Sequence, residues 1–250
     1  MDSMTRGAER RPGDRVGSGT SSGAVGAGGL GRSAVWLAWA AIAGAVVFNA
    51  GWVIGDALQT AGYSVSRHDV SELEALTAQH PWVMLTASGI AGVLAILFAL
   101  GALRPALRGP GRWDTLGAWL LAASLAGLDN LSDTFFRLDC RAADPGCTRG
   151  VAVASWHGEV HVIAGVVTAV ATVAAGFVLA ARMRRLDGWR DLARPALGFT
   201  LVFLAVLVPY LVLQGRAGGG YLQRALIVLL SLAVVVLALR VRRLALTHPA

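Results

Sequence analysis

Long apolar blocks, separated by short polar and basic stretches, dominate the chain after residue 33. A helix of roughly 20 apolar residues crosses a bilayer core of about 30 Å. Six blocks reach or approach that length, at residues 34–58, 82–103, 115–136, 154–181, 196–213 and 222–239. The pattern therefore predicts an all-α fold, a polytopic membrane bundle of six transmembrane helices that occupies residues 34–243.

The two ends of the chain differ from this membrane domain. Residues 1–33 are rich in Gly, Ser and Arg and lack an apolar period, which predicts a disordered tail. Residues 244–250 form a second, short tail. The apolar block after the first tail is too long for the h-region of a signal peptide, so it is expected to stay as the first helix.

The distribution of charge predicts the orientation in the membrane. All 22 basic residues are Arg, and most lie in the first tail, at 104–114, at 182–195 or after residue 239. Because cytoplasmic segments carry an excess of Arg and Lys, both termini are expected in the cytoplasm. A net charge of +7 can indicate a nucleic-acid partner, but these Arg residues follow helix ends instead of one surface. The expected partner is the lipid bilayer of the cell membrane, and the Arg-only, Ala-rich composition favours a bacterial inner membrane.

Two cysteines, Cys140 and Cys147, share the predicted external loop 137–153. A short exported loop with two cysteines is typical of a disulfide, and two free thiols are the alternative. The loop contains no His and no third Cys, which argues against a metal site there.

The ionisable side chains inside the predicted spans all fall in the outer half of their helices. Such a group costs about 2.5–3.5 kcal/mol on insertion scales, so these positions are candidates for function. They are Asp56, Asp129, Asp133, His157, Glu159, His161 and Arg224. Together with the external loop 59–81, they predict an outward-facing pocket lined by His and Asp.

Residue spacing makes this pocket more specific. His157 and His161 are four residues apart and share one helix face, as do Asp129 and Asp133. The two His residues, with Asp133, could hold a divalent metal such as zinc, and interhelical hydrogen bonding is the alternative. Because a buried carboxyl can act as an acid or a base, the predicted catalytic residues are Ser71, Glu72, Asp129, Asp133, His157 and His161.

Other residues near these groups form the predicted substrate-binding wall. They are Asn49, Trp52, Asp56, Phe136, Trp156, Gln223 and Arg224. Core packing is the alternative for the aromatic side chains, and Arg224 could instead be the ion-pair partner of Asp129 and Asp133. The string Asp69-Val-Ser71-Glu72 also has the form of a helix N-cap with an acidic first turn.

Four motifs carry a family resemblance. They are His68-Asp-Val-Ser-Glu-Leu-Glu-Ala-Leu76 with His80-Pro-Trp82, Phe136-Arg-Leu-Asp139 with Asp144-Pro-Gly-Cys147, Trp156-His-Gly-Glu-Val-His161, and Gln223-Arg224. Together they resemble the domain of unknown function 998 family of prokaryotic six-helix membrane proteins, with Glu74 and Arg137 as departures from its usual Gly and Pro. The resemblance implies the six-helix fold and marks Ser71, Glu72, Asp139, His157, His161, Gln223 and Arg224, but it implies no established activity.

Two classes of function stay open. One is a membrane-embedded enzyme that acts on a lipid-like or isoprenoid substrate, by metal-dependent hydrolysis or by acid-initiated terpenoid cyclisation with aromatic walls stabilising cations. The other is a non-catalytic accessory, sensor or lipid-binding protein in which the same polar residues are structural. A transporter is disfavoured because no internal repeat is visible.

Overall fold

The computed structural model describes residues 31–60 and 62–247, and within these ranges it contains helices and no strand. Five long helices are apolar enough to cross a membrane. They are α1 (Arg32–Ala57), α2 (Pro81–Phe98, continued to Ala106), α7 (Trp156–Met183), α8 (Arg190–Leu213) and α9 (Gly219–Thr247). The prediction of an all-α fold is confirmed for this part of the chain. Residues 1–30 of the first predicted tail and 248–250 of the second lie outside the described residues, while 244–247 belong to α9.

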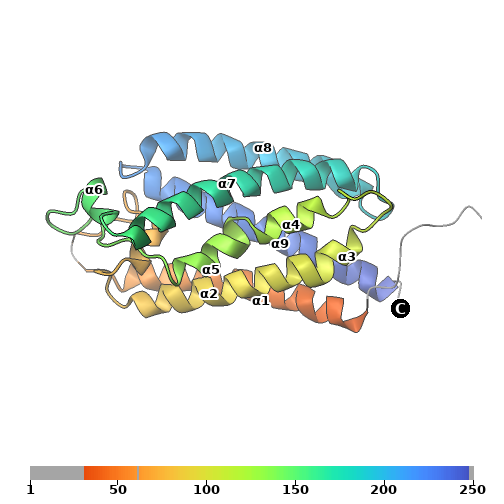
Figure 1. Ribbon diagram of the computed structural model, residues 1–250, viewed down its shortest axis with the longest axis horizontal. Coiled ribbons are helices and arrows are strands. Elements are labelled where there is room, and N and C mark those ends of the chain that lie inside the picture. The colour runs from red at the N-terminus through yellow and green to blue at the C-terminus, as the bar shows by residue number, and fades with distance from the viewer. Residues whose placement is uncertain (1–30, 61, 248–250) are drawn as a thin grey trace, which may run out of the picture.

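Shorter elements connect the long helices. They are the 3-10 turn η1 (Val70–Glu74), the π-helical turn η2 (Ala99–Leu103) with α3 (Arg104–Ala106), α4 (Leu116–Ala122), the π-helical turn η3 (Leu125–Asp129), α5 (Asn130–Asp133) and α6 (Arg149–Ala152). The long helices run along one axis, and α1 begins at the end of the bundle where α9 finishes (Figure 1). The opposite end, called the loop end below, carries α6 and the start of α7 (Figure 1).

Alanine makes up much of the core, and many large apolar residues lie on the outside. Ala38, Ala99 and Ala118 are fully buried where α1, η2 and α4 meet, which lets helices approach closely. By contrast, Val166 and Val170 of α7 are exposed. A large exposed apolar surface is the reverse of what a soluble protein shows, and it is compatible with contact to membrane lipid.

The third predicted span is broken. The sequence predicts one helix over residues 115–136, whereas the structure ends α4 at Ala122 and resumes with η3 and α5. The break frees backbone groups, and neighbours satisfy them: the Leu125 N–H donates to Thr172 Oγ1 of α7 at 3.0 Å, and the Ala126 N–H donates to Ser124 Oγ at 3.2 Å. Irregular backbone at membrane depth is tolerated where it is buried in protein or lines a cavity.

Glycine allows the broken segment to pack tightly. A Cβ on Gly92 of α2 would lie 2.6 Å from the backbone N of Leu131, and a Cβ on Gly127 would lie 2.2 Å from the Ala122 carbonyl oxygen. Both distances are far below a normal contact. A side chain on Gly92 would therefore push α2 away from the broken segment, and a side chain on Gly127 would distort the turn that follows α4.

Cys140 and Cys147 lie at disulfide distance, with their Cα atoms 6.1 Å apart. Of the two alternatives that the sequence leaves open, the structure favours the disulfide.

Candidate functional site

A cavity of about 910 Å³ lies between the long helices near the loop end. One part of its wall is apolar and includes Ala41 and Phe48 of α1, Ala91 of α2, and Leu230 and Val234 of α9. The other part is polar and contains Asp69, Ser71, Glu72, Glu74, Asp129, Asp133 and His161. The cavity is therefore amphipathic, with its charged groups gathered on one side.

Asp133 and His161 form the central pair of the polar wall. The Asp133 Oδ1 and His161 Nδ1 atoms are 3.0 Å apart, and both side chains are largely buried. His161 Nδ1 also lies 3.1 Å from the carbonyl oxygen of Phe136. Since both neighbours of Nδ1 are acceptors, the geometry assigns a proton to Nδ1.

Glu74 is the most deeply buried carboxyl of this wall, with 2% of its surface exposed. The Ser88 hydroxyl donates to its Oε1. Burial, followed by the charge of nearby Asp133, holds the pKa of Glu74 well above its usual range, so the side chain can store a proton. The two departures from the family pattern meet here, because Arg137 Nε donates to the Glu74 carbonyl oxygen at 2.6 Å.

Asp129 and Glu72 complete the carboxyl cluster. Asp129 Oδ1 accepts from Thr168 Oγ1 at 2.8 Å. Glu72 accepts from the backbone N–H groups of Asp69 at 3.3 Å and Ala142 at 2.8 Å. It therefore joins η1 to the loop between Cys140 and Cys147. Burial raises the pKa of Glu72 to about 7.

Asp69 lines the cavity beside residues that the sequence did not single out. Its Oδ2 accepts from the Tyr210 hydroxyl at 3.0 Å and from Gln214 Nε2 at 3.2 Å. Burial raises its pKa. Gln223, a predicted binding residue, lines the same cavity and accepts from the Val70 N–H. Tyr210 lies near the end of the apolar block 196–213 and Gln214 follows it, and their only sequence signal is that they are polar.

Arg224 belongs to a separate, closed network. It makes a bidentate ion pair with Asp56 at 2.9 and 2.6 Å, and its Nη2 also donates to Tyr63 at 2.7 Å. Its Nη1 donates to three backbone carbonyls, those of Val65, His68 and Gly220. All guanidinium nitrogens have acceptors, so Arg224 holds the 63–68 loop on α1 and α9. The interpretation that it pairs with Asp129 and Asp133 is wrong.

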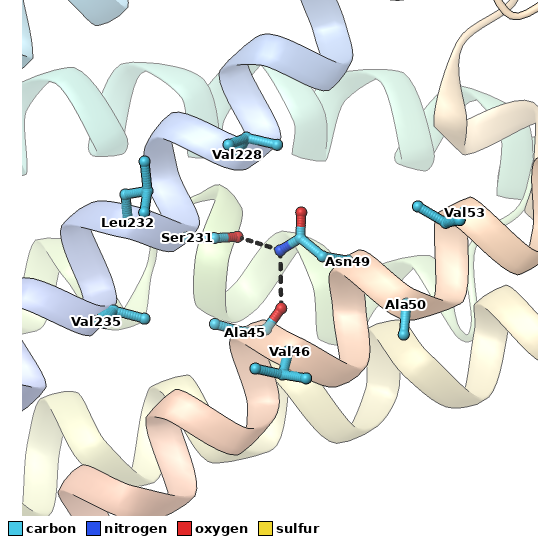
Figure 2. Close-up of a pocket in the computed structure, with 9 residues that line it drawn as sticks. All are labelled: Ala45, Val46, Asn49, Ala50, Val53, Val228, Ser231, Leu232 and Val235. Atoms are coloured by element: carbon cyan, nitrogen blue, oxygen red, sulfur yellow. Dashed lines mark hydrogen bonds between the residues drawn. The ribbon is translucent and has the colours of Figure 1, made fainter.

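Five other predicted residues do not line this cavity: His157, Asn49, Trp52, Phe136 and Trp156. His157 stacks against Trp156, with ring centroids 3.8 Å apart, and its Nδ1 lies 3.2 Å from the Phe135 carbonyl oxygen. Asn49 donates to Ser231 of α9 at 2.8 Å and lines a smaller apolar groove between α1 and α9 (Figure 2). Trp52 Nε1 donates to Asn49 Oδ1 at 3.1 Å.

Phe136 contributes its carbonyl oxygen to His161, while its ring lies edge-on to Trp156. Asp139, which the family resemblance marks, accepts from both the N–H and the hydroxyl of Ser155 at the start of α7, at 2.8 and 2.6 Å. These hydrogen bonds lower the pKa of Asp139. Both residues thus hold the beginning of α7, and neither lines the cavity.

The predicted metal ligands do not converge. Among the residues that the structure describes, no group of three or more His, Cys, Asp or Glu side chains has the arrangement of a metal site. His161 is directed to Asp133, and His157 is directed to the Phe135 carbonyl oxygen. The set of His157, His161 and Asp133 is therefore not assembled for zinc.

Helices α7 and α8 separate beside the cavity. A Cβ on Gly176 of α7 would lie 2.2 Å from Thr200 Oγ1 of α8, whereas a Cβ on Gly165 would meet no atom within 4 Å. Figure 1 shows the two helices diverging toward the loop end. Gly165 and Val166 of α7 and Leu211 of α8 line the cavity, so its apolar side lies next to the outer surface of the bundle.

Comparison with known proteins gives a family and no activity. Residues 42–240 match the model of a family described as a protein of unknown function (DUF998). A search of curated proteins and a search of solved structures each found no match. The match covers more than half of the chain, and the apolar helices indicate a membrane protein. The chain belongs to the DUF998 family.

Proposed function

We propose that this protein is an enzyme of the bacterial inner membrane that acts on a lipid-like or isoprenoid substrate by general acid–base chemistry. The observation that carries the proposal is the placement of the Asp133–His161 pair at the polar side of an amphipathic cavity, with buried Glu74 and Asp129 lining the same side. An amphiphile fits such a wall because its tail can lie on the apolar side and its head on the polar side.

The proposed topology has six spans with both termini in the cytoplasm. The broken segment α4–η3–α5 is 18 residues from Leu116 to Asp133, about 27 Å at 1.5 Å per residue, close to the thickness of a bilayer core. The start of α1 and the end of α9 share one end of the bundle, as an even number of spans requires (Figure 1). The Arg-rich segments favour the cytoplasmic side for that end.

The proposed chemistry gives each residue a role. His161 Nε2 accepts a proton from the substrate, and the Asp133 carboxylate stabilises the imidazolium that forms. Glu74 donates a proton, because its buried carboxyl is held in the neutral form. An acid–base route has more support than metal-dependent hydrolysis, since the carboxyl–His groups contact one another while the predicted metal ligands do not converge.

The separation of α7 and α8 supports entry from the bilayer. Their divergence places apolar cavity residues beside the lipid-facing surface, so a tail can enter sideways without crossing the polar loops. Substrate access from the outer leaflet is therefore part of the proposal.

A test compares lipid extracts from cells that express the protein with extracts from cells that express variants. His161→Gln and Glu74→Gln are expected to abolish the change in lipid or isoprenoid composition that the unaltered protein produces. Glu159→Gln, an exposed carboxyl on α7 outside the cavity, is the matched control and should leave it unchanged. Full retention of that change in both cavity variants would refute an acid–base role.

A non-catalytic lipid-binding protein is the second candidate. The observation in its favour is that Arg224, Glu72 and Asp139 are fully engaged in holding loops and helix ends together. Thermal unfolding in detergent separates the two candidates. Catalytic variants keep their melting temperature while losing function, whereas loss of both together indicates structural residues.

A further inference from the structure

We propose that the cavity selects an amphiphile whose head carries a hydrogen-bond donor and no negative charge, an alcohol or an amine, and that Asp69 Oδ1 accepts from that donor. This inference rests on the proposed function, because it presumes that an amphiphile occupies the cavity. It adds which chemical class of head the polar wall receives.

One carboxylate oxygen of Asp69, Oδ1, receives no hydrogen bond from the described residues. Only 7% of its surface is exposed, and it lines the cavity. Tyr210 and Gln214 both donate to Oδ2. Oδ1 is buried and has no hydrogen-bond partner among residues 31–60 and 62–247. A buried carboxylate oxygen without a donor is unfavourable, and a donor supplied by a ligand would remove that penalty.

The neighbouring side chains are already engaged. Gln214 Nε2 lies 3.2 Å from both Asp69 Oδ2 and the Tyr210 hydroxyl oxygen, and Gln223 uses its Oε1 to accept from Val70. The guanidinium of Arg224 is occupied by Asp56, Tyr63 and backbone carbonyls. None of these side chains donates to Asp69 Oδ1 in the structure, so this oxygen is left for a donor that a ligand supplies.

The make-up of the cavity wall favours a neutral or cationic head over an anionic one. The carboxyl groups that line it are Asp69, Glu72, Glu74, Asp129 and Asp133. The basic residues that line it are His161, which is paired with Asp133, and Arg149 and Arg216, which are exposed near the loop end. Sites for phosphate heads instead concentrate Arg or Lys on the ligand. A wall in which carboxyls predominate favours a neutral donor or a cation.

The experiment measures binding of three amphiphiles with the same alkyl tail: a long-chain alcohol, a long-chain amine and an alkyl phosphate. Each is added at equal mole fraction to detergent micelles that contain the full chain at pH 8, and bound molecules are counted by native mass spectrometry. The alcohol and the amine are expected to bind at least about tenfold more tightly than the phosphate. Tighter binding of the amine than of the alcohol shows that the site also favours a positive charge, and equal binding shows that it favours the hydrogen-bond donor alone.

Asp69→Asn is expected to weaken binding of the alcohol and the amine by about tenfold or more, because hydrogen bonds to a charged group are among the strong ones. Glu159→Gln is the matched control and should bind as the unaltered protein does. Tyr210→Phe provides a second variant: it removes a donor from Asp69 but keeps the carboxylate, so the preference for alcohol or amine over phosphate should persist.

Two outcomes would overturn the inference alone: phosphate bound as tightly as the alcohol, or folded Asp69→Asn with unchanged binding of both donor heads. If Asp69→Asn does not fold, loss of the preference in Tyr210→Phe overturns it. Binding of none of the three amphiphiles refutes the proposed function together with this inference.

Discussion

Two of the regions in which the described residues bury charge differ in how completely that charge is satisfied. Around Arg224, all guanidinium nitrogens have acceptors and the Asp56 carboxylate is held by two of them. In the cavity, Asp133 and His161 share one contact, and Asp69 retains an oxygen without a donor. Burial is similar in both regions. Between these two regions, the unmet hydrogen-bonding group distinguishes the candidate site from the structural network, because buried charge is present in both.

The largest expected effect is on the Arg224 network. Asp56→Asn leaves the Arg224 guanidinium buried without its counter-charge, and loss of one partner of a buried pair costs about 3–5 kcal/mol. The melting temperature in detergent should fall sharply. Asp187→Asn is the control, because its pair with Arg190 is exposed and is worth about 0–1 kcal/mol. Equal effects of the two substitutions would contradict the proposed importance of the network.

A smaller effect is expected where α2 meets the broken segment. Gly92→Ala places a Cβ 2.6 Å from the Leu131 N, so the two elements must separate, at about 1–3 kcal/mol. Gly198→Ala, in a helix position with no atom within 4 Å of a Cβ, should have little effect on the melting temperature. A neutral Gly92→Ala would show that this contact is looser than described.

The pH dependence of stability tests whether Glu72 of η1 is held in the fold as a buried carboxyl. The pKa of Glu72 is raised from its usual 4.5 to about 7, so the folded state binds more protons than the unfolded state between these values. Stability is therefore fully retained below about pH 4.5 and falls as pH rises toward 7. Glu72→Gln should remove this part of the slope, which thermal unfolding across pH 4 to 8 measures. An unchanged slope would exclude Glu72 as its source.

The smallest effect on stability is expected at the cavity pair itself. Asp133→Asn keeps an acceptor oxygen for His161 Nδ1, so the loss should be about 1 kcal/mol. Function should nevertheless disappear if the proposed acid–base role holds. Measured beside Asp56→Asn, this substitution makes the same chemical change in the other polar region. A larger destabilisation at Asp133 than at Asp56 would reverse the comparison.

The long helices were predictable because each is an apolar block of about bilayer length. Their ends differ by a few residues, since α8 begins at Arg190 and α9 continues to Thr247, where basic and polar residues stay helical beyond the apolar block. The break after Ala122 was not predictable from hydropathy. It depends on Thr172 and Gly92, which are distant in sequence and become neighbours only after folding.

The candidate site was predictable in part. Spacing of four residues places His157 and His161 on one helix face, but it does not say how far each lies from the loop end. His161 reaches Asp133, whereas His157 lies one turn nearer the loops, against Trp156. Glu74 lies in the predicted external loop 59–81, where the sequence marks it only as a departure from the family pattern, and the fold buries it. The partner of Arg224 is 168 residues away, so no local pattern distinguishes Asp56 from Asp129.

The broken segment also bears on how the chain is synthesised. In the proposed topology, Asp129, Asn130 and Asp133 make the third span a weak stop signal that does not partition into lipid unaided. Its freed Leu125 N–H is satisfied by Thr172, which is translated later. Stable insertion of this span must therefore await α7, and membrane integration is coupled to tertiary assembly rather than completed one helix at a time.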